Sequence, residues 1–291
     1  MELRACVPGG ARPERERGEM CIGRAMPLAL AAVIALIVPA QAQYFFKVYP
    51  YKTADAGAVE MSYFTTFIPS SDGAIEFAND ESFSREDLWA HSLELEYGLS
   101  HKFTVGYYAD FLHPDDGDFE YIQSKLLARY RLFEKFERPV DLALYGEYII
   151  PNRDYSEAEK FEFRLIIEKD LGPWRIDLNP ILEKVTSGEE VEEGLEFAYA
   201  AGLYYHNMGD GIWAKTDLQI IPGIEFYGSL GELADAGGWD ERRHYIFPVV
   251  DLFAPGYSDW KLHWNFGPGF GISDAADDVV IKSIVTAEFL F

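Results

Sequence analysis

The last thirteen residues of the chain, Val279 to Phe291, alternate between apolar and polar side chains. One face carries Val279, Ile281, Val285, Ala287, Phe289 and Phe291, and the other carries Lys282, Thr286 and Glu288. Three residues depart from the pattern, namely Ser283, Ile284 and Leu290. A period of two residues predicts an extended strand with one apolar and one polar face. Chain ends usually fray, whereas a sheet that closes on itself needs its last strand to pair with its first. The segment therefore favours a closed sheet, with an exposed edge strand of a soluble all-β domain as the alternative.

Eleven earlier stretches show the same alternation, and no stretch after residue 57 predicts a helix convincingly. The expected strands are 58–68, 88–98, 103–112, 120–132, 140–150, 160–170, 174–184, 194–206, 212–227, 243–253 and 260–271. The stretch 243–253 is the least regular, because Pro248 cannot donate a hydrogen bond to a neighbouring strand. The chain thus predicts twelve strands, which have the length of about nine to eleven residues that a tilted membrane-spanning strand needs.

The connections between these strands alternate between short turns and longer loops that are rich in Asp and Glu. Short turns on one side and long polar loops on the other are typical of outer-membrane barrels. An even number of strands places the first and last strand ends together on the short-turn side, which is the periplasmic side.

The closing strand, which ends on Phe291, resembles that of bacterial outer-membrane β-barrels. The segments Leu95–Leu99, Glu225–Ser229 and Asn265–Gly271 are similar to segments of proteobacterial outer-membrane proteins with loosely transporter-like roles. The resemblance implies an all-β fold, a closed antiparallel transmembrane β-barrel of twelve strands. It also implies that the barrel-assembly machinery recognises the closing strand through Phe289 and Phe291.

The front of the chain carries a targeting segment. Its apolar run, 26–38, is too short for a membrane-spanning helix, which needs about twenty residues. Arg24 precedes the run and Ala40-Gln41-Ala42 follows it, so the pattern predicts a secretory signal peptide cleaved after about Ala42. An uncleaved membrane anchor is the alternative. Both cysteines, Cys6 and Cys21, lie in this leader, so the mature chain is expected to have no disulfide.

Three regions follow from these assignments. Residues 1–42 are an N-terminal extension with the signal peptide, and either Met20 or Met26 is favoured as the true start. Residues 43–57 are interpreted as a periplasmic N-terminal segment, although the sequence leaves open whether they plug the interior of the barrel. Residues 58–291 form the barrel.

The chain is strongly acidic, with a formal net charge of −24 at pH 7. Binding to nucleic acid through its phosphates requires the opposite charge, so nucleic acid is excluded as a partner. The content of aromatic residues, 15%, argues against disorder. No window of eighteen apolar residues follows the leader, which excludes helical membrane spans.

Strand length and strand number decide which face of the sheet points inward. Soluble strands usually have about five or six residues, and a soluble barrel of twelve strands has a wide interior to fill. We therefore expect apolar side chains to face lipid and charged side chains to face a wet lumen. Aromatic residues near the strand ends are expected to form interfacial girdles, and these are Tyr97, Tyr107, Tyr148, Trp174, Tyr205 and Trp260.

The leading functional hypothesis is an outer-membrane, porin-like channel for passive passage of small solutes. Its predicted pore-lining residues are Glu60, Glu94, Glu96, Asp110, Lys125, Arg129, Arg131, Asp141, Glu147, Glu162, Arg164, Glu168, Arg175, Asp177, Glu183 and Lys215. Unpaired carboxylates favour cations, so the pore is expected to prefer cations weakly. The alternative is that these charges pair across strands and fill the lumen, which leaves a structural, adhesive or cation-binding role.

Two further hypotheses have weaker support in the sequence. Some twelve-strand barrels hydrolyse lipids, but none of the six histidines lies in a recognisable nucleophile motif. The acidic loops at 115–118 and 189–193 suggest Ca²⁺ binding, but the EF-hand pattern fails because Leu126 stands where the last ligand is required. We expect no cofactor, no catalytic residue and no metal site; the expected partners are outer-membrane lipid, lipopolysaccharide, the assembly machinery and small solutes.

Overall fold

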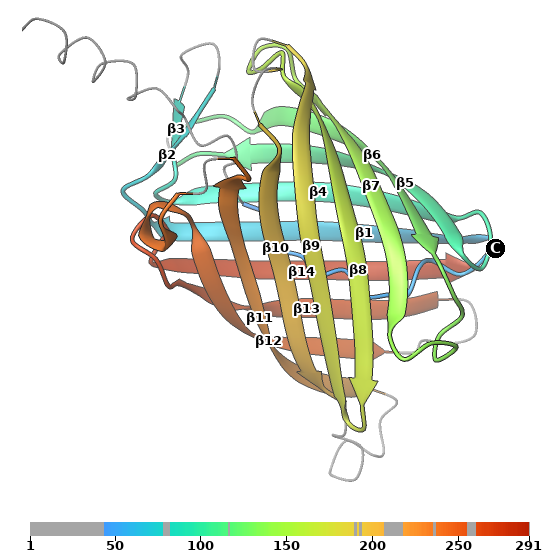
Figure 1. Ribbon diagram of the computed structural model, residues 1–291. Coiled ribbons are helices and arrows are strands. Elements are labelled where there is room, and N and C mark those ends of the chain that lie inside the picture. The colour runs from blue at the N-terminus through green and yellow to red at the C-terminus, as the bar shows by residue number, and fades with distance from the viewer. Residues whose placement is uncertain are drawn as a thin grey trace, which may run out of the picture. The chain divides into compact units, whose positions relative to one another are not determined.

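A computed structural model of the protein describes residues 44–77, 82–115, 117–188, 191, 194–206, 218–234, 237–254 and 260–290. Twelve antiparallel strands form a closed barrel (Figure 1). They are β1 (Ala58–Ser70), β4 (Leu88–Gly98), β5 (Phe103–His113), β6 (Glu120–Arg131), β7 (Asp141–Pro151), β8 (Glu159–Leu171), β9 (Trp174–Ser187), β10 (Glu196–Tyr205), β11 (Gln219–Glu232), β12 (His244–Ala254), β13 (Trp260–Gly271) and β14 (Val279–Leu290).

The barrel closes where β14 pairs with β1. Their register runs from Ala58 opposite Leu290 to Ser70 opposite Val279, with one irregularity after Phe67. On its other side β1 pairs with β4, and each later strand pairs with its neighbour in sequence. The closed twelve-strand antiparallel barrel predicted from the alternation is therefore confirmed.

The sequence-based bounds are close to the observed ones, and three features differ. The expected strand 212–227 begins in residues that are not described, and β11 extends instead to Glu232. The loop after β1 contains a small hairpin, β2 (Ala74–Glu76) and β3 (Ser82–Ser84), which is too short to show a period. A 3-10 helix, Trp239–Glu241, interrupts the loop before β12.

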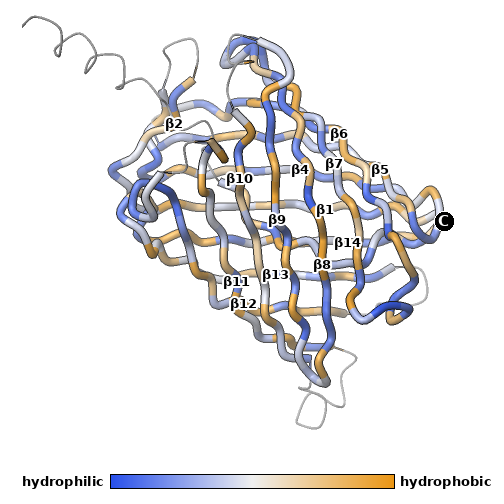
Figure 2. Tube along the Cα trace, in the orientation of Figure 1, coloured by the Kyte–Doolittle hydropathy of each residue, from blue (hydrophilic) through white to orange (hydrophobic). Residues whose placement is uncertain are grey.

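The two faces of each strand differ sharply in exposure. On β4 the side chains of Glu94 and Glu96 are 0% and 1% exposed, whereas Leu95 between them is 47% exposed. The hydropathy colouring alternates along the strands in the same way (Figure 2). A buried polar face and an exposed apolar face reverse the arrangement of a soluble barrel and match a lipid-facing one. No helix among the described residues has the length and apolar character that a membrane crossing requires.

Pro248 is accommodated within β12 instead of ending it. It pairs with Ile224 of β11, but the register between β12 and β13 is interrupted between Ile246 and Val250. The facing residues of β13 include Gly267 and Gly269. A Cβ atom on Gly269 would lie 2.2 Å from the Phe247 ring, so this glycine makes room for a buried aromatic side chain.

The substitution Gly269→Val tests this packing. Because the added side chain overlaps the Phe247 ring, we expect it to lower the free energy of unfolding by about 1–3 kcal/mol. Urea unfolding in lipid vesicles, followed by tryptophan fluorescence, measures the change. Gly238→Ala is the matched control, since its nearest neighbouring atom is 3.6 Å from the added Cβ. Equal stability of the two variants would contradict the packing.

Candidate functional site in the barrel interior

The predicted pore-lining residues that the structure describes all belong to the inner face. Ten of them are buried, namely Glu94, Glu96, Asp110, Arg129, Asp141, Glu147, Glu162, Glu168, Asp177 and Glu183. Glu60 stands directly opposite Glu96 and Glu288, so it shares their face. Lys125, Arg131, Arg164 and Arg175 contact inner-face groups. Lys215 lies outside the described residues. Whether these side chains line a conducting pore stays a prediction.

Several of these charges form ion pairs on the inner face, some within one strand and some between strands. Lys125 Nζ lies 3.2 Å from Asp110 and 3.4 Å from Glu147, which flank it on β5 and β7. Arg129 Nη1 lies 3.2 Å from Glu96. Lys125 stands diagonally to both carboxylates, two residues from Gln123 and Leu127, which are their register partners, so these charges are neutralised locally. Carboxylates still outnumber basic groups on the wall.

The largest departure from the sequence-based expectation is the position of the N-terminal segment. Residues 43–57 are interpreted from the sequence as a periplasmic segment, with a plug in the barrel left open. In the structure residues 44–54 run inside the barrel, where they contact inner-face residues, and Phe46, Tyr49 and Tyr51 are 1%, 3% and 1% exposed. The segment, coloured blue, passes behind the strands in Figure 1. The physical reason is that a barrel of this width encloses more volume than its wall side chains fill. We name residues 44–54 the lumen segment.

The first part of the lumen segment packs against aromatic side chains of β11 and β12. The ring centroid of Phe46 lies 5.2 Å from Tyr227, 5.1 Å from Tyr245 and 4.8 Å from Phe247. The same cluster includes Tyr155, Phe77 and Phe83 from the long loops. The lumen segment therefore begins near the long-loop end of the barrel.

Tyr49 packs against inner-face side chains of β5 to β9. Its hydroxyl hydrogen-bonds to the hydroxyl groups of Tyr108 and, at 3.4 Å, Tyr145, and these two tyrosines donate in turn to Glu94 and Glu147. The guanidinium groups of Arg129 and Arg164 lie 5.1 and 5.0 Å from the Tyr49 ring centroid. Such cation–π contacts are stronger when the groups are shielded from water.

The backbone of the lumen segment is held by side chains of the wall. Asn179 accepts a hydrogen bond from the Tyr49 N–H at 2.7 Å and donates one to the Tyr49 carbonyl at 3.1 Å. Glu168 accepts from the Tyr51 N–H at 2.8 Å. Arg129 donates to the carbonyls of Pro50, at 2.9 Å, and Lys52, at 2.6 Å.

Ion pairs and a close backbone contact complete the path to the short-turn end. Lys47 Nζ lies 2.7 Å from Glu94, and Lys52 Nζ lies 3.0 Å from Glu288. The chain then leaves the lumen beside Gly98, where a Cβ atom would lie 2.0 Å from the Asp55 carbonyl oxygen. Only glycine fits at that position, so the turn after β4 is shaped to let the segment pass.

At the long-loop end, a buried ion pair joins two loops. Arg85, which follows β3, donates to both carboxylate oxygens of Asp277, at 2.9 and 2.6 Å. Ser71 and Tyr245 each donate to the same carboxylate at 2.6 Å. Burial alone would raise the pKa of the Asp277 carboxyl, but hydrogen bonding and charge attraction from Arg85 lower it to about 2. The ion pair ties the loop after β1 to the loop before β14.

Replacing this carboxylate tests the tie through its pH dependence. Because the folded-state pKa of Asp277 lies below the ordinary value of about 3.9, its ionised form stabilises the fold above about pH 4, and this is lost as the pH falls toward about 2. We expect Asp277→Asn to be less stable than wild type by roughly 2 kcal/mol near neutral pH. The difference should shrink on acidification. Urea unfolding across this pH range measures it, and a pH-independent difference would contradict the role.

The histidines and acidic loops that the sequence suggests for catalysis or metal binding lie away from the lumen segment, have partners already, or lie outside the described residues. His91 contacts Tyr63 on the outer wall, His244 stacks on Trp239, and His263 lies 3.3 Å from Asp251. His101, His113 and His206 are exposed. Asp116 and the acidic residues 189, 190, 192 and 193 lie outside the described residues.

One carboxylate cluster lies at the short-turn end. Asp141, Glu168 and Asp170 place carboxylate oxygens within 4.8 Å of one another. Lys135 forms an ion pair with Glu168 and lies 2.9 Å from Asp170, so the cluster already holds a cationic group of the chain itself.

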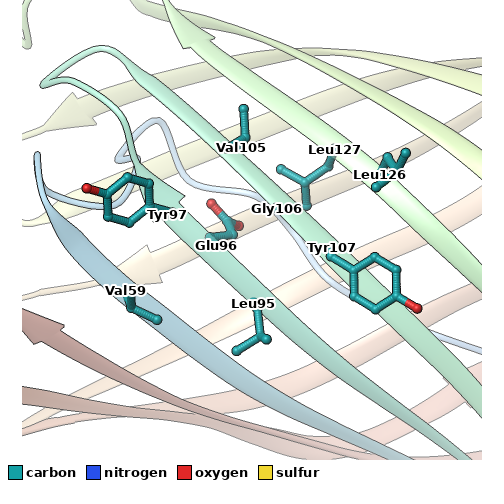
Figure 3. Close-up of a pocket in the computed structure, with 9 residues that line it drawn as sticks. All are labelled: Val59, Leu95, Glu96, Tyr97, Val105, Gly106, Tyr107, Leu126 and Leu127. Carbon is teal, nitrogen blue, oxygen red and sulfur yellow. The ribbon is translucent and has the colours of Figure 1, made fainter.

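A cavity of about 600 Å³ opens on the outer wall instead of the lumen. Leu95, Tyr97, Tyr107 and Leu126 surround it, with Gly106 among the lining residues (Figure 3). These four side chains belong to the exposed apolar face. The cavity is therefore a depression that lipid acyl chains would cover.

Sequence reasoning missed several residues that hold the lumen segment. Tyr108 and Tyr145 fall on the polar face, yet aromatic residues are not recognised as lumen residues by polarity alone. Asn179 is uncharged and was not distinguished from its neighbours. The available signal was the segment itself, because residues 44–52 combine aromatic and basic side chains directly after the leader.

Comparison with known proteins gives a fold and no family. No protein-family model matches the chain, and no curated protein matches it. Among solved structures, the COG4313 outer membrane channel from Pseudomonas putida F1 has 17% sequence identity and a TM-score of 0.53, over 84% of this chain and 100% of that one. The KdgM porin has 10% identity and a TM-score of 0.46, over 80% and 99%. LpxR from Salmonella typhimurium has 10% identity and a TM-score of 0.40, over 80% and 100%. At such low identity the likeness supports the fold alone, which is that of an outer-membrane β-barrel.

Proposed function

We propose that this protein is an outer-membrane channel for small solutes, with a weak preference for cations, and that the lumen segment closes it in the state described here. The observation that carries the proposal is the lumen segment itself. It lies buried in a charged interior, and the hydrogen bonds that hold its backbone come from wall side chains. A segment held in this way can leave without breaking the barrel.

The buried state of the wall carboxylates supports closure. Glu94 is 0% and Glu168 is 2% exposed with the lumen segment in place. Both carboxylates have partners in that segment, since Lys47 pairs with Glu94 and the Tyr51 N–H donates to Glu168. Departure of the segment would remove Lys47 from Glu94 and leave that carboxylate facing water, and unpaired carboxylates in a lumen favour cations.

Delivery to the outer membrane belongs to the same proposal. The leader would be cleaved after about Ala42, and the assembly machinery would bind the closing strand through Phe289 and Phe291. Phe289 pairs with Val59 of β1 and Trp260 of β13, at the seam of the barrel. Phe291 and the cleavage point lie outside the described residues. Outer-membrane lipid and lipopolysaccharide would surround the apolar outer face.

Deleting residues 44–54 tests the closure. We expect discrete single-channel current steps from the deletion variant in planar lipid bilayers, and few or none from the full-length mature protein, because only the variant has an unfilled lumen. Leu95→Ala, on the outer face, serves as a control that should behave as wild type. Equal currents from both proteins would exclude closure by the segment, and silence from both would exclude the channel and favour a filled, structural barrel.

The ion preference is tested in the deletion background. In a salt gradient we expect a reversal potential that indicates cations. Glu94→Gln should move the cation-to-anion permeability ratio toward one, because this carboxylate has lost its partner Lys47. Leu95→Gln adds the same amide group to the outer face of the same strand and should leave the ratio unchanged. An anion-selective reversal potential before substitution would overturn the preference.

A further inference from the structure

The barrel interior recognises the lumen segment as a peptide. Five hydrogen bonds from Asn179, Glu168 and Arg129 meet the backbone of residues 49–52, and a further one from Lys282 reaches the Phe46 carbonyl at 3.3 Å. Asn179 meets both the N–H and the carbonyl of one residue, as a neighbouring strand would. Backbone hydrogen bonds of this kind provide affinity for an extended chain whatever its side chains.

Around Pro50, the backbone N–H and carbonyl groups of the lumen segment form hydrogen bonds with wall side chains. The N–H groups of Tyr49 and Tyr51 are both accepted by wall side chains, and Pro50 between them has no N–H to satisfy. The Pro50 carbonyl is met by Arg129. An unpaired buried N–H would be costly, so the wall is fitted to an amide backbone in this register and direction.

Separate pockets receive the side chains. The Phe46 ring lies among Tyr227, Tyr245 and Phe247. The Lys47 ammonium pairs with Glu94, and its Nζ lies 5.0 Å from the ring centroid of Phe64. These pockets add a preference for aromatic and basic side chains to the recognition of the backbone.

A third pocket receives Tyr49. Its hydroxyl hydrogen-bonds to the Tyr108 hydroxyl, and the guanidinium groups of Arg129 and Arg164 lie 5.1 and 5.0 Å from its ring centroid. This pocket accepts an aromatic ring that carries a hydrogen-bonding group at its tip.

We infer that the barrel interior is a binding site for linear peptides that bear aromatic and basic side chains in an extended conformation, and that residues 44–54 are its tethered occupant. This inference rests on the proposed function, because the lumen segment has to leave before another peptide enters. The tether, residues 55–57, contributes none of the six backbone hydrogen bonds, because its own contacts are with Gly98 and Lys261. A peptide without the tether should therefore bind at the same contacts, more weakly, because tethering raises the effective concentration.

The test uses the full chain folded with its segment in place. A site-specific protease sequence inserted after Ala56 allows the segment to be cut once the barrel has formed in detergent micelles. A synthetic peptide of residues 44–57, with a fluorophore at its C-terminal end, is then added, and its fluorescence anisotropy is recorded. We expect saturable binding to the cut barrel and none to the uncut one.

Matched variants identify the contacts. Tyr49→Ala in the peptide and Asn179→Ala in the barrel should each weaken binding at least about tenfold, since each removes contacts of Tyr49. A peptide of the same composition in scrambled order should not compete, and Leu95→Ala on the outer face should change nothing. Equal binding of the scrambled peptide would overturn the inference, because it would indicate association with the micelle.

The behaviour of the cut segment also tests the peptide-binding site. If the cut segment stays bound and exchanges with labelled peptide, non-covalent recognition is supported; if it leaves and no peptide rebinds, the inference is wrong. Peptide binding is measured by anisotropy and conduction by ion current. The channel and the peptide-binding site can therefore be contradicted independently. A barrel that binds peptide but never conducts would remove only the channel, and one that conducts after deletion but binds no peptide would remove only the peptide site.

Discussion

The structure depends on the need to satisfy every backbone hydrogen bond within hydrocarbon. Strands meet this need only if the sheet has no open edge, and here pairing of β14 with β1 removes the edge. Closure of the barrel also determines the orientation of the side chains, because successive residues of a strand then face lipid and interior in turn. Leu95 faces outward between two buried glutamates for this reason. The polar interior is thus a consequence of building a membrane wall from strands.

The polar interior requires partners for its charged groups, and the N-terminal segment of the chain supplies part of them. Charged groups inside a twelve-strand barrel need either water or partners. Neighbouring strands supply some partners, as Lys125 shows with its two flanking carboxylates. The lumen segment supplies others, through Lys47 and through backbone groups that meet Asn179, Glu168 and Arg129. Its aromatic side chains pack against aromatic side chains of the wall, so this segment contributes both polar and apolar contacts.

The sequence allowed the barrel to be predicted almost completely, because period-two alternation is local and repeats in every strand. It also placed the charged inner-face residues, since side-chain direction follows from strand parity. It could not place the lumen segment, whose contacts join residues far apart in the chain and have no period; Tyr49 meets Asn179 across 130 positions. The Arg85–Asp277 ion pair could not be predicted either, because only the conformation of two loops brings these residues together.

The most direct measurement of the central claim concerns the surroundings of Tyr49 in intact cells. A photo-crosslinking phenylalanine analogue incorporated at position 49 should, on irradiation, join to peptides of β5 or β7 that contain Tyr108 or Tyr145, as identified by mass spectrometry. These are the side chains within reach of the Tyr49 hydroxyl. Crosslinks to periplasmic proteins, with none to the barrel wall, would show that the segment hangs outside and that the interior is filled in another way.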